Sequence, residues 1–242
     1  MPTIKACLFD MDGLLIDSER IYTLTTEQVL RDHGREPHFP ALIKSDLMGR
    51  PGPEAATLFL RWAGLEEELG VEGYLARQAT LQRALFPSVA PMPGAAALLD
   101  DLVQRRVELA LATSSTTQNF HLKTSRLQDL FRVFGGNVIC GDDERVRGRG
   151  KPEPDIFVHA LEDINRGRRS RGQVEILPDE CLVLEDGVPG VTAGLRAGNH
   201  VLWVPDEQIL ALHHDQVDQI LGEKGKMVHS LEDFPWEYYG LK

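Results

Sequence analysis

Five short apolar runs, each followed by a polar or glycine-containing turn, constrain the fold of this chain most strongly. Such runs are typical of buried parallel strands, and they lie at 4–9, 107–112, 138–140, 181–184 and 201–204. Helical patterns separate most of them, at 94–105, about 118–131, 154–164 and 190–197. Alternation of strand and helix predicts a doubly wound α/β fold with a parallel, Rossmann-like sheet, in which ligands bind at the carboxyl ends of the strands.

The alternation is interrupted between the first and second strands. The 75 residues from Ser18 to Met92 contain helical patterns but no strand pattern, and a simple crossover connection is much shorter. We therefore expect an inserted helical cap at 18–89 and an α/β core at 1–17 and 90–242. A separate helical bundle is the alternative. The helical patterns of the insertion lie at 21–33, 52–63, 66–69 and 73–85.

Charge and cysteine content narrow the class of partner. The 242 residues carry a formal net charge of -11, so we expect neither nucleic acid nor a membrane surface as a partner, and an anionic substrate needs a local cationic site. There is no uncharged run of 18 residues, and the three cysteines argue against a complete disulfide framework. We expect a cytoplasmic protein, and a monomer because no sustained heptad pattern is present.

The first polar loop follows the first strand and contains Asp10, Asp12 and Gly13. Hydrolysis of a phosphate ester requires an anionic nucleophile to approach an anionic phosphoryl group, which a bound magnesium ion makes easier. Asp10 would then attack phosphorus and Asp12 would act as general acid and base, while the amides of Gly13 and Leu14 face the phosphate. Taken alone, the pair also fits two exposed carboxylates in a turn.

Two further loops offer groups that bind phosphate. Thr113, Ser114 and Ser115 follow the second strand, where hydroxyls and amides can donate to phosphate oxygens, although such a cluster before a helix is also a common helix cap. Lys151 precedes a rigid Pro-Glu-Pro turn, where an ammonium group can neutralise phosphate and nucleophile. An exposed lysine is the alternative.

Glu185 and Asp186 end the fourth apolar run, and Gly190 then opens a helix. Adjacent carboxylates at the end of a buried strand are costly unless a cation compensates them, and a hard divalent cation prefers such oxygen ligands. We expect Asp186 to bind the metal and Glu185 to orient a bound water or to pair with Lys151. Because every motif follows a predicted strand, one shared phosphoryl-transfer site is indicated.

These residues resemble the four motifs of the haloacid-dehalogenase superfamily, in order, over essentially the whole chain. The matching segments are DMDGLLIDSE at 10–19, ATSS at 112–115, GKPEPDIF at 150–157 and LEDGVPG at 184–190. The insertion is similar to the C1 cap of the subgroup that contains β-phosphoglucomutase, glycerol-phosphate phosphatases and pseudouridine-5'-phosphatase. The chain is most similar to the pseudouridine-5'-phosphatase branch. The segments that carry this similarity are FPSVAPMPGA at 86–95, LKTSRLQDLF at 122–131, GDD at 141–143 and AGNHVLWVPD at 197–206.

The resemblance implies a role for each motif residue. Asp10 becomes the nucleophile and a ligand of Mg²⁺, Asp12 the acid and base with its backbone carbonyl on the metal, and Asp186 a further metal ligand. Thr113 and Lys151 become phosphate-binding residues. Gly187 departs from the pattern, since many related proteins carry Ser or Ala there, and we expect looser support of the metal ligands. The basic tract Asn165–Gly172 is also longer than usual, and we expect a solvated loop away from the site.

These observations favour a Mg²⁺-dependent phosphatase that acts on a small phosphorylated metabolite, with pseudouridine-5'-phosphate or a similar sugar or polyol phosphate as the expected substrate. Specificity is expected from the cap, near Glu19, Tyr22 and the segment Met48-Gly49-Arg50. A phosphoglucomutase would use the same four motifs. Outside the enzymes, a receiver-like signalling module or an inactive binding protein is the alternative.

Overall fold

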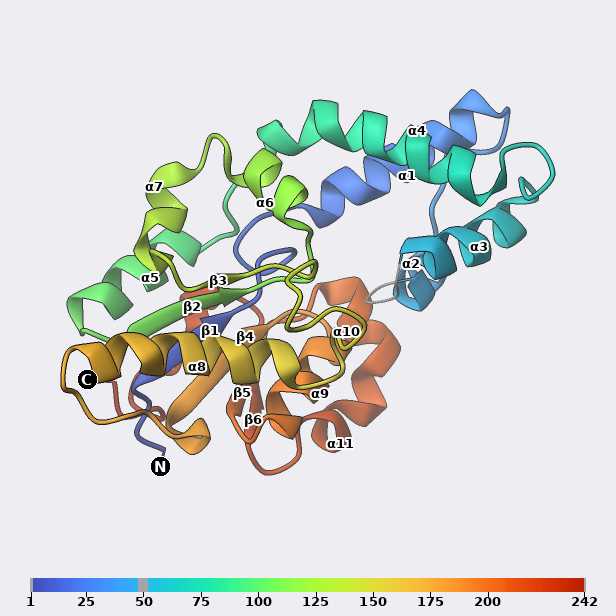
Figure 1. Ribbon diagram of the computed structural model, residues 1–242. Coiled ribbons are helices and arrows are strands. Elements are labelled where there is room, and N and C mark those ends of the chain that lie inside the picture. Colours follow the sequence, from blue (N-terminus) through green and yellow to red (C-terminus); the bar gives the residue numbers. More distant parts are fainter. Residues whose placement is uncertain (1, 48–51, 242) are drawn as a thin grey trace.

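The computed structural model describes residues 2–47 and 52–241, and within them it contains a six-stranded parallel sheet with the order β3-β2-β1-β4-β5-β6 (Figure 1). The strands are β1 (Ala6–Phe9), β2 (Glu108–Ala112), β3 (Val138–Ile139), β4 (Cys181–Glu185), β5 (His200–Trp203) and β6 (Gly225–Met227). The predicted doubly wound α/β fold is confirmed. The chain order reverses on either side of β1, which pairs with β2 and β4, and ligands bind at such a switch point.

The central strands β1 and β4 are buried on both faces. Successive side chains point to opposite sides of the sheet, and apolar clusters cover both sides. Cys7 and Phe9 of β1 belong to one apolar cluster, together with α5 (Ala95–Gln104) and Phe131 of α7 (Gln128–Phe131). Ala6 and Leu8 belong to the other cluster, together with α8 (Asp155–Ser170), α9 (Val188–Arg196) and α11 (Val217–Leu221). Helices therefore cover both faces, and the carboxyl edge of the sheet holds the loops.

The helical insertion lies between β1 and α5 and consists of α1 (Glu19–Asp32), α2 (Ala41–Leu47), α3 (Gly52–Ala63), α4 (Gly70–Leu85) and the 3₁₀ turn η1 (Phe86–Ser88). Its helices extend to one side of the sheet (Figure 1), and they have an apolar cluster of their own, in which Phe59 stacks on Tyr74. The two connections to the sheet lie side by side, since Asp17 N donates to Ala90 O and Met92 N to Leu15 O, both at 2.9 Å.

Several predicted elements differ from the structure. Residues 66–69 form a turn rather than a helix, and the helix predicted at 118–131 is divided into α6 (Thr117–Thr124) and α7. Sequence patterns did not indicate α2, α10 (Glu207–His213), α11 or β6, which are all seven residues or shorter. We find no candidate for a membrane-spanning helix in residues 2–47 and 52–241.

The basic tract Asn165–Gly172 was predicted wrongly as a loop, because α8 continues to Ser170. Its arginines form ion pairs: Arg168 pairs with Glu108 at 3.1 Å, and Arg169 pairs with Glu175 at 2.8 Å. The Asn165 side chain is buried and bonds both the N–H and the carbonyl of Ile176, at 2.8 and 2.9 Å. These contacts accompany a helix that continues past Ile164, where sequence reasoning ended it.

Candidate functional site

Three carboxylates and one ammonium group meet at the carboxyl ends of the two central strands. Asp10 directly follows β1, Glu185 is the last residue of β4, and Asp186 follows it. One carboxylate oxygen from each lies within 4.8 Å of the others. Lys151 Nζ lies 2.5 Å from Asp10 Oδ1, 2.6 Å from Glu185 Oε1 and 2.9 Å from the carbonyl of Ala112. The structure thus brings together the predicted nucleophile, metal ligands and lysine, as expected for loops that share one sheet edge.

The charges in this cluster are not balanced. Burial raises the pKa of Asp10 to about 7, an effect that Lys151 opposes and that Glu185 and Asp12 reinforce. Burial and the neighbouring carboxylates Glu185 and Asp10 likewise raise the pKa of Asp186 well above its usual value. One lysine cannot neutralise three carboxylates, and their oxygen donors suit a hard divalent cation. The residues present therefore fit a magnesium ion.

Gly13 closes the turn against this cluster. Its φ of +78° is in the left-handed region, and a Cβ at this position would lie 2.1 Å from Asp186 Oδ2. The Gly13 amide, which we expected to face a phosphate, donates instead to the carbonyl of Ile16 at 3.0 Å. In this structure Gly13 leaves free the space beside Asp186 that a side chain would fill. By contrast, a Cβ at Gly187 would make only ordinary contacts, 3.7 Å from Pro189 Cδ and 4.0 Å from Glu185 Oε2.

Asp12 lies beside the loop that follows β2. Its Oδ2 accepts from Ser115 Oγ at 2.7 Å and from Thr113 Oγ1 at 3.5 Å, and Thr113 Oγ1 also accepts from the Ser115 amide at 3.0 Å. Thr113 is fully buried, whereas Ser114 is exposed and lines a cavity together with Ser115. In this structure Thr113 supports Asp12 and the Ser115 amide, and Ser114 and Ser115 face the open space.

Lys123, near the end of α6, is a site residue that sequence reasoning missed. It is fully buried, and its Nζ donates to Asp12 Oδ1, to Ser115 Oγ at 2.8 Å and to Tyr22 Oη at 3.0 Å. Burial lowers the pKa of Lys123, but Asp12 and Tyr22 more than offset this and raise it above the ordinary value. Burial alone would raise the pKa of Asp12, yet Lys123 brings it below its usual range.

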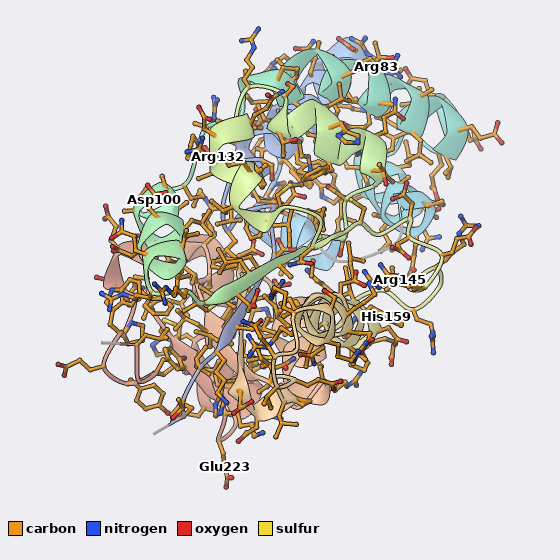
Figure 2. The ribbon with its side chains drawn as sticks, turned by 60° about the vertical axis from the view of Figure 1, so that its left-hand side comes forward. Arg83, Asp100, Arg132, Arg145, His159 and Glu223 are labelled. Atoms are coloured by element: carbon orange, nitrogen blue, oxygen red, sulfur yellow. The ribbon has the colours of Figure 1, made fainter. Side chains whose placement is uncertain are left out.

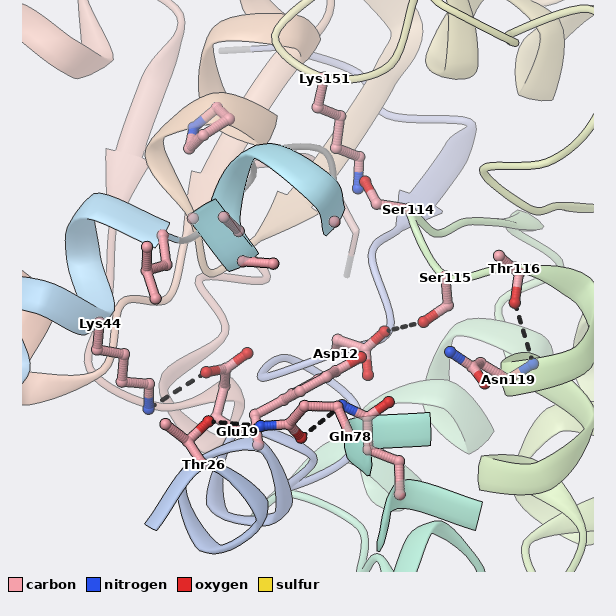
Figure 3. Close-up of a pocket in the computed structure, with 18 of the residues that line it drawn as sticks. Asp12, Glu19, Thr26, Lys44, Gln78, Ser114, Ser115, Thr116, Asn119 and Lys151 are labelled. Carbon is pink, nitrogen blue, oxygen red and sulfur yellow. Dashed lines mark hydrogen bonds and ion pairs between the residues drawn. The ribbon is translucent and has the colours of Figure 1, made fainter. Parts of the chain in front are cut away.

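A cavity of about 590 Å³ opens between the sheet edge and the helical insertion (Figure 3). Asp10, Asp12 and Lys151 line one side. From the insertion, Glu19 and Tyr22 also line it, and Lys44 pairs with Glu19 at 3.2 Å. The predicted segment Met48-Gly49-Arg50 lies outside the described residues.

The far side of the cavity carries uncharged polar groups. Gln78 Nε2 donates to Thr26 Oγ1 at 3.2 Å and to Tyr74 Oη at 3.0 Å, and Gln82 Nε2 donates to Gln78 Oε1 at 3.3 Å. Asn119 of α6 and Thr116, the cap of that helix, also line the cavity (Figure 3). A ligand in this space therefore meets hydroxyls and amides, the ion pair of Glu19 and Lys44, and the carboxylate cluster with Lys151.

Arg145 stabilises the loop that carries Lys151. It pairs with Asp143 at 2.8 Å and with the buried Asp163 of α8 at 2.9 Å, and Figure 2 shows it on the same side of the molecule as His159 of that helix. Arg149 pairs with Asp155, also at 2.8 Å. These arginines are engaged in holding the loop against α8, so Lys151 is the cation that this segment brings to the cluster.

Comparison with known proteins gives the family. The family model for haloacid dehalogenase-like hydrolases matches residues 4–198. The chain belongs to this family. A hydrolase of the same family from Deinococcus radiodurans, whose crystal structure contains bound phosphate and sodium, is 27% identical and superimposes with a TM-score of 0.72 over 100% of this chain and 98% of that one.

Two curated relatives of this haloacid dehalogenase-like hydrolase align over nearly the whole chain. A probable pseudouridine-5'-phosphatase from Saccharomyces cerevisiae is 39% identical and covers 98% of each chain. (DL)-Glycerol-3-phosphatase 2 from Arabidopsis thaliana is 36% identical over 99% of this chain and 92% of its own length. Together with the family match, these relatives confirm the predicted enzyme class, a phosphoric monoester hydrolase.

Proposed function

We propose that the protein is a Mg²⁺-dependent phosphomonoesterase for small phosphorylated metabolites, and that the reaction proceeds through an aspartyl-phosphate on Asp10. One observation carries this proposal: a buried carboxylate, Asp10, lies on the cavity wall against Lys151 and two further carboxylates, with Asp12 two residues along the chain. This combination supplies a nucleophile, a phosphate-binding cation, metal ligands and an acid at one place.

The residues divide the reaction into two displacements. In the first, Asp10 attacks phosphorus and the bond from phosphorus to the substrate oxygen breaks, so that an alcohol leaves. The proton for that oxygen comes from the protonated form of Asp12, a minor form because, despite burial, Lys123 lowers the pKa of this carboxyl. In the second, Asp12 removes a proton from water, water attacks phosphorus, and the bond to Asp10 breaks to release inorganic phosphate. Lys151 and the hydroxyls of Ser114 and Ser115 bind the phosphoryl oxygens in both steps.

Asp10 and Asp186 would hold the magnesium ion, with the backbone carbonyl of Asp12 as a third ligand by family resemblance. When bound, the ion would reduce the electrostatic repulsion between the anionic nucleophile and the anionic phosphate. Glu185 stays paired with Lys151 at 2.6 Å, so this carboxylate positions the lysine. Ion and lysine together bring the charge of the carboxylate cluster close to balance.

The helical insertion, residues 18–89, acts as the cap that encloses the substrate. Its contribution to the cavity wall includes Thr26, Tyr74 and Gln78, which offer hydroxyl and amide groups to a neutral, hydroxylated leaving group. A sugar, polyol or nucleoside 5'-phosphate has this character, and pseudouridine-5'-phosphate is the proposed substrate. The names of the yeast and Arabidopsis relatives support this class.

The test is a screen of purified protein against pseudouridine-5'-phosphate, glycerol phosphates and sugar phosphates, with release of inorganic phosphate as the readout. We expect Mg²⁺-dependent release without any bisphosphate activator. Transfer of the phosphoryl group to a sugar, or a requirement for a bisphosphate, would instead identify a mutase. Asp10→Asn, which keeps the size of the side chain but removes the nucleophile, is the matched control and should be inactive on every substrate.

A further inference from the structure

Lys123 is a buried cation for which the four motifs give no role. Its side chain is fully buried although it lies on a short helix of mostly polar residues. Burial of an ammonium group is unfavourable unless partners compensate it. The ammonium group of Lys123 donates three hydrogen bonds, to Asp12 Oδ1, Ser115 Oγ and Tyr22 Oη. The lysine is therefore held in one orientation.

Its partners come from separate parts of the chain. Asp12 follows β1, Ser115 follows β2, and Tyr22 belongs to α1 of the helical insertion. Lys123 Nζ also lies 4.6 Å from the ring centroid of Phe86 in η1, and 5.0 Å from that of Tyr22, within the range of cation–π contacts. Tyr22 and Phe86 flank the two connections of the insertion, so Lys123 ties Asp12 to the base of the insertion.

The two carboxylate oxygens of Asp12 therefore have different hydrogen-bond partners. Lys123 holds Oδ1 from the buried side, while Oδ2 accepts from Ser115, which lines the cavity. A carboxylate that hands a proton to a leaving group must keep one oxygen within hydrogen-bond reach of it, and small displacements of such a group cost large factors in rate. Without Lys123, Asp12 loses the contact to Oδ1 and is held only through Oδ2, by Ser115 and Thr113, so its side chain is less restricted.

We propose that Lys123 is a positioning residue for Asp12: it holds this carboxylate toward the cavity and links its placement to the seating of the helical insertion. The assignment rests on the proposed function, since it concerns the residue that serves as acid and base there. Lys123 contacts one of the proposed phosphate-binding residues, Ser115, at 2.8 Å. None of its hydrogen bonds in the described residues goes to Lys151, Ser114 or the carboxylates of Asp10, Glu185 and Asp186, so its effect passes through Asp12 and Ser115.

The test compares two substrates in the variant Lys123→Met, which has a similar length and no charge. Departure of p-nitrophenolate needs no acid, whereas departure of an alkoxide from glycerol phosphate does. We expect kcat for glycerol phosphate to fall by about 10²-fold, within the range of general acid–base effects, with KM changed less than about threefold. With p-nitrophenyl phosphate we expect a rapid burst of nitrophenolate, stoichiometric with enzyme, before slow turnover, because only the second displacement still requires Asp12.

Three further variants serve as controls. Lys5→Met removes a lysine that pairs with Glu180 at 2.5 Å, at the opposite end of β1 from Asp10, and should leave both substrates unaffected. The single variant Asp12→Asn is compared with the double variant Asp12→Asn/Lys123→Met. Both lack the carboxylate of Asp12, and the double variant also lacks the lysine, so it buries no unpaired charge. We expect these two to have equal activity on p-nitrophenyl phosphate, because Lys123 has no carboxylate left to position.

An equal loss on both substrates in Lys123→Met, without a burst, would overturn the assignment, as would a further loss of more than about tenfold when Lys123→Met is added to Asp12→Asn. If the single variant does not fold, the double variant decides the question. Absence of Mg²⁺-dependent hydrolysis in the wild-type protein would overturn the proposed function and this assignment together, whereas the Lys123 outcomes leave the function standing.

Discussion

Gly190 should be indispensable for the placement of Glu185, whereas Gly187, three residues earlier, should not. A Cβ built at Gly190 would lie 1.8 Å from Glu185 Oε1 and 1.9 Å from its Cδ. Ordinary contacts begin near 3.4 Å, so the carboxylate in Gly190→Ala must withdraw by about 1.6 Å. Glu185 is buried and pairs with Lys151 at 2.6 Å, and this movement would stretch the ion pair beyond hydrogen-bond distance.

The expected magnitude follows from these distances. Overpacking of a buried site costs about 1–3 kcal/mol, and loosening a buried ion pair adds to that, since removal of one partner altogether costs about 3–5 kcal/mol. We expect a loss of about 2–4 kcal/mol in the free energy of unfolding, which for a chain of this size lowers Tm by roughly 5–15 °C. Activity should fall about 10- to 100-fold, the usual effect of disturbing the partners of metal and phosphate ligands.

The assay is thermal unfolding together with steady-state hydrolysis of p-nitrophenyl phosphate, for Gly190→Ala and the control Gly187→Ala. The added methyl group of the control makes contacts of 3.7 and 4.0 Å, so its Tm should change by less than about 3 °C and its activity by less than about twofold. Equal Tm and activity in the two variants would show that Glu185 is free to move and is not needed to position Lys151.

Three further predictions follow from the charges and contacts of the site. Chelation of divalent metal should stop hydrolysis and Mg²⁺ should restore it, whereas a metal-independent rate would contradict the roles of Asp10 and Asp186. Burial raises the pKa of Asp10 to about 7 in the folded, metal-free protein, above its value in the unfolded chain. The protonated form therefore stabilises the fold fully below about pH 4, and this stabilisation is lost as the pH rises through 7. Tm measured in chelator should fall over this interval, and Asp10→Asn should reduce the fall. Gln78→Leu should raise KM for a hydroxylated substrate about tenfold through the loss of buried hydrogen bonds and leave kcat for p-nitrophenyl phosphate within about threefold; an unchanged KM across the metabolite panel would place the substrate elsewhere in the cavity.

The fold and the motif residues were accessible from the sequence because both depend on local patterns. Four of the six strands are buried runs rich in apolar residues, and β3, although only two residues long, lies within a predicted run. Carboxyl ends of parallel strands meet at one edge, so the closeness of Asp10, Lys151 and Asp186 follows once the strands are found. The exception, β6, is the tripeptide Gly-Lys-Met, which pairs only because β5 offers it a free edge.

The features that escaped sequence reasoning depend on long-range pairing. Lys123 looks like a solvated lysine on a polar helix, and it is buried only because Asp12, 111 residues away, supplies the opposite charge. The end of α8 was placed too early for the same reason, since Glu108 and Glu175 compensate arginines that by themselves suggest a loop. The Gly13 amide bonds within its own turn, which a motif match does not reveal.

The central claim, that Asp10 carries the phosphoryl group, has a direct measurement. Borohydride reduces an acyl phosphate to the alcohol, so wild-type protein quenched during turnover with Mg²⁺ should yield homoserine at position 10 in peptide mass spectrometry. The product should be absent without substrate and in Asp10→Asn. Homoserine at position 12 or 186 instead, or continued turnover by Asp10→Asn, would contradict the account.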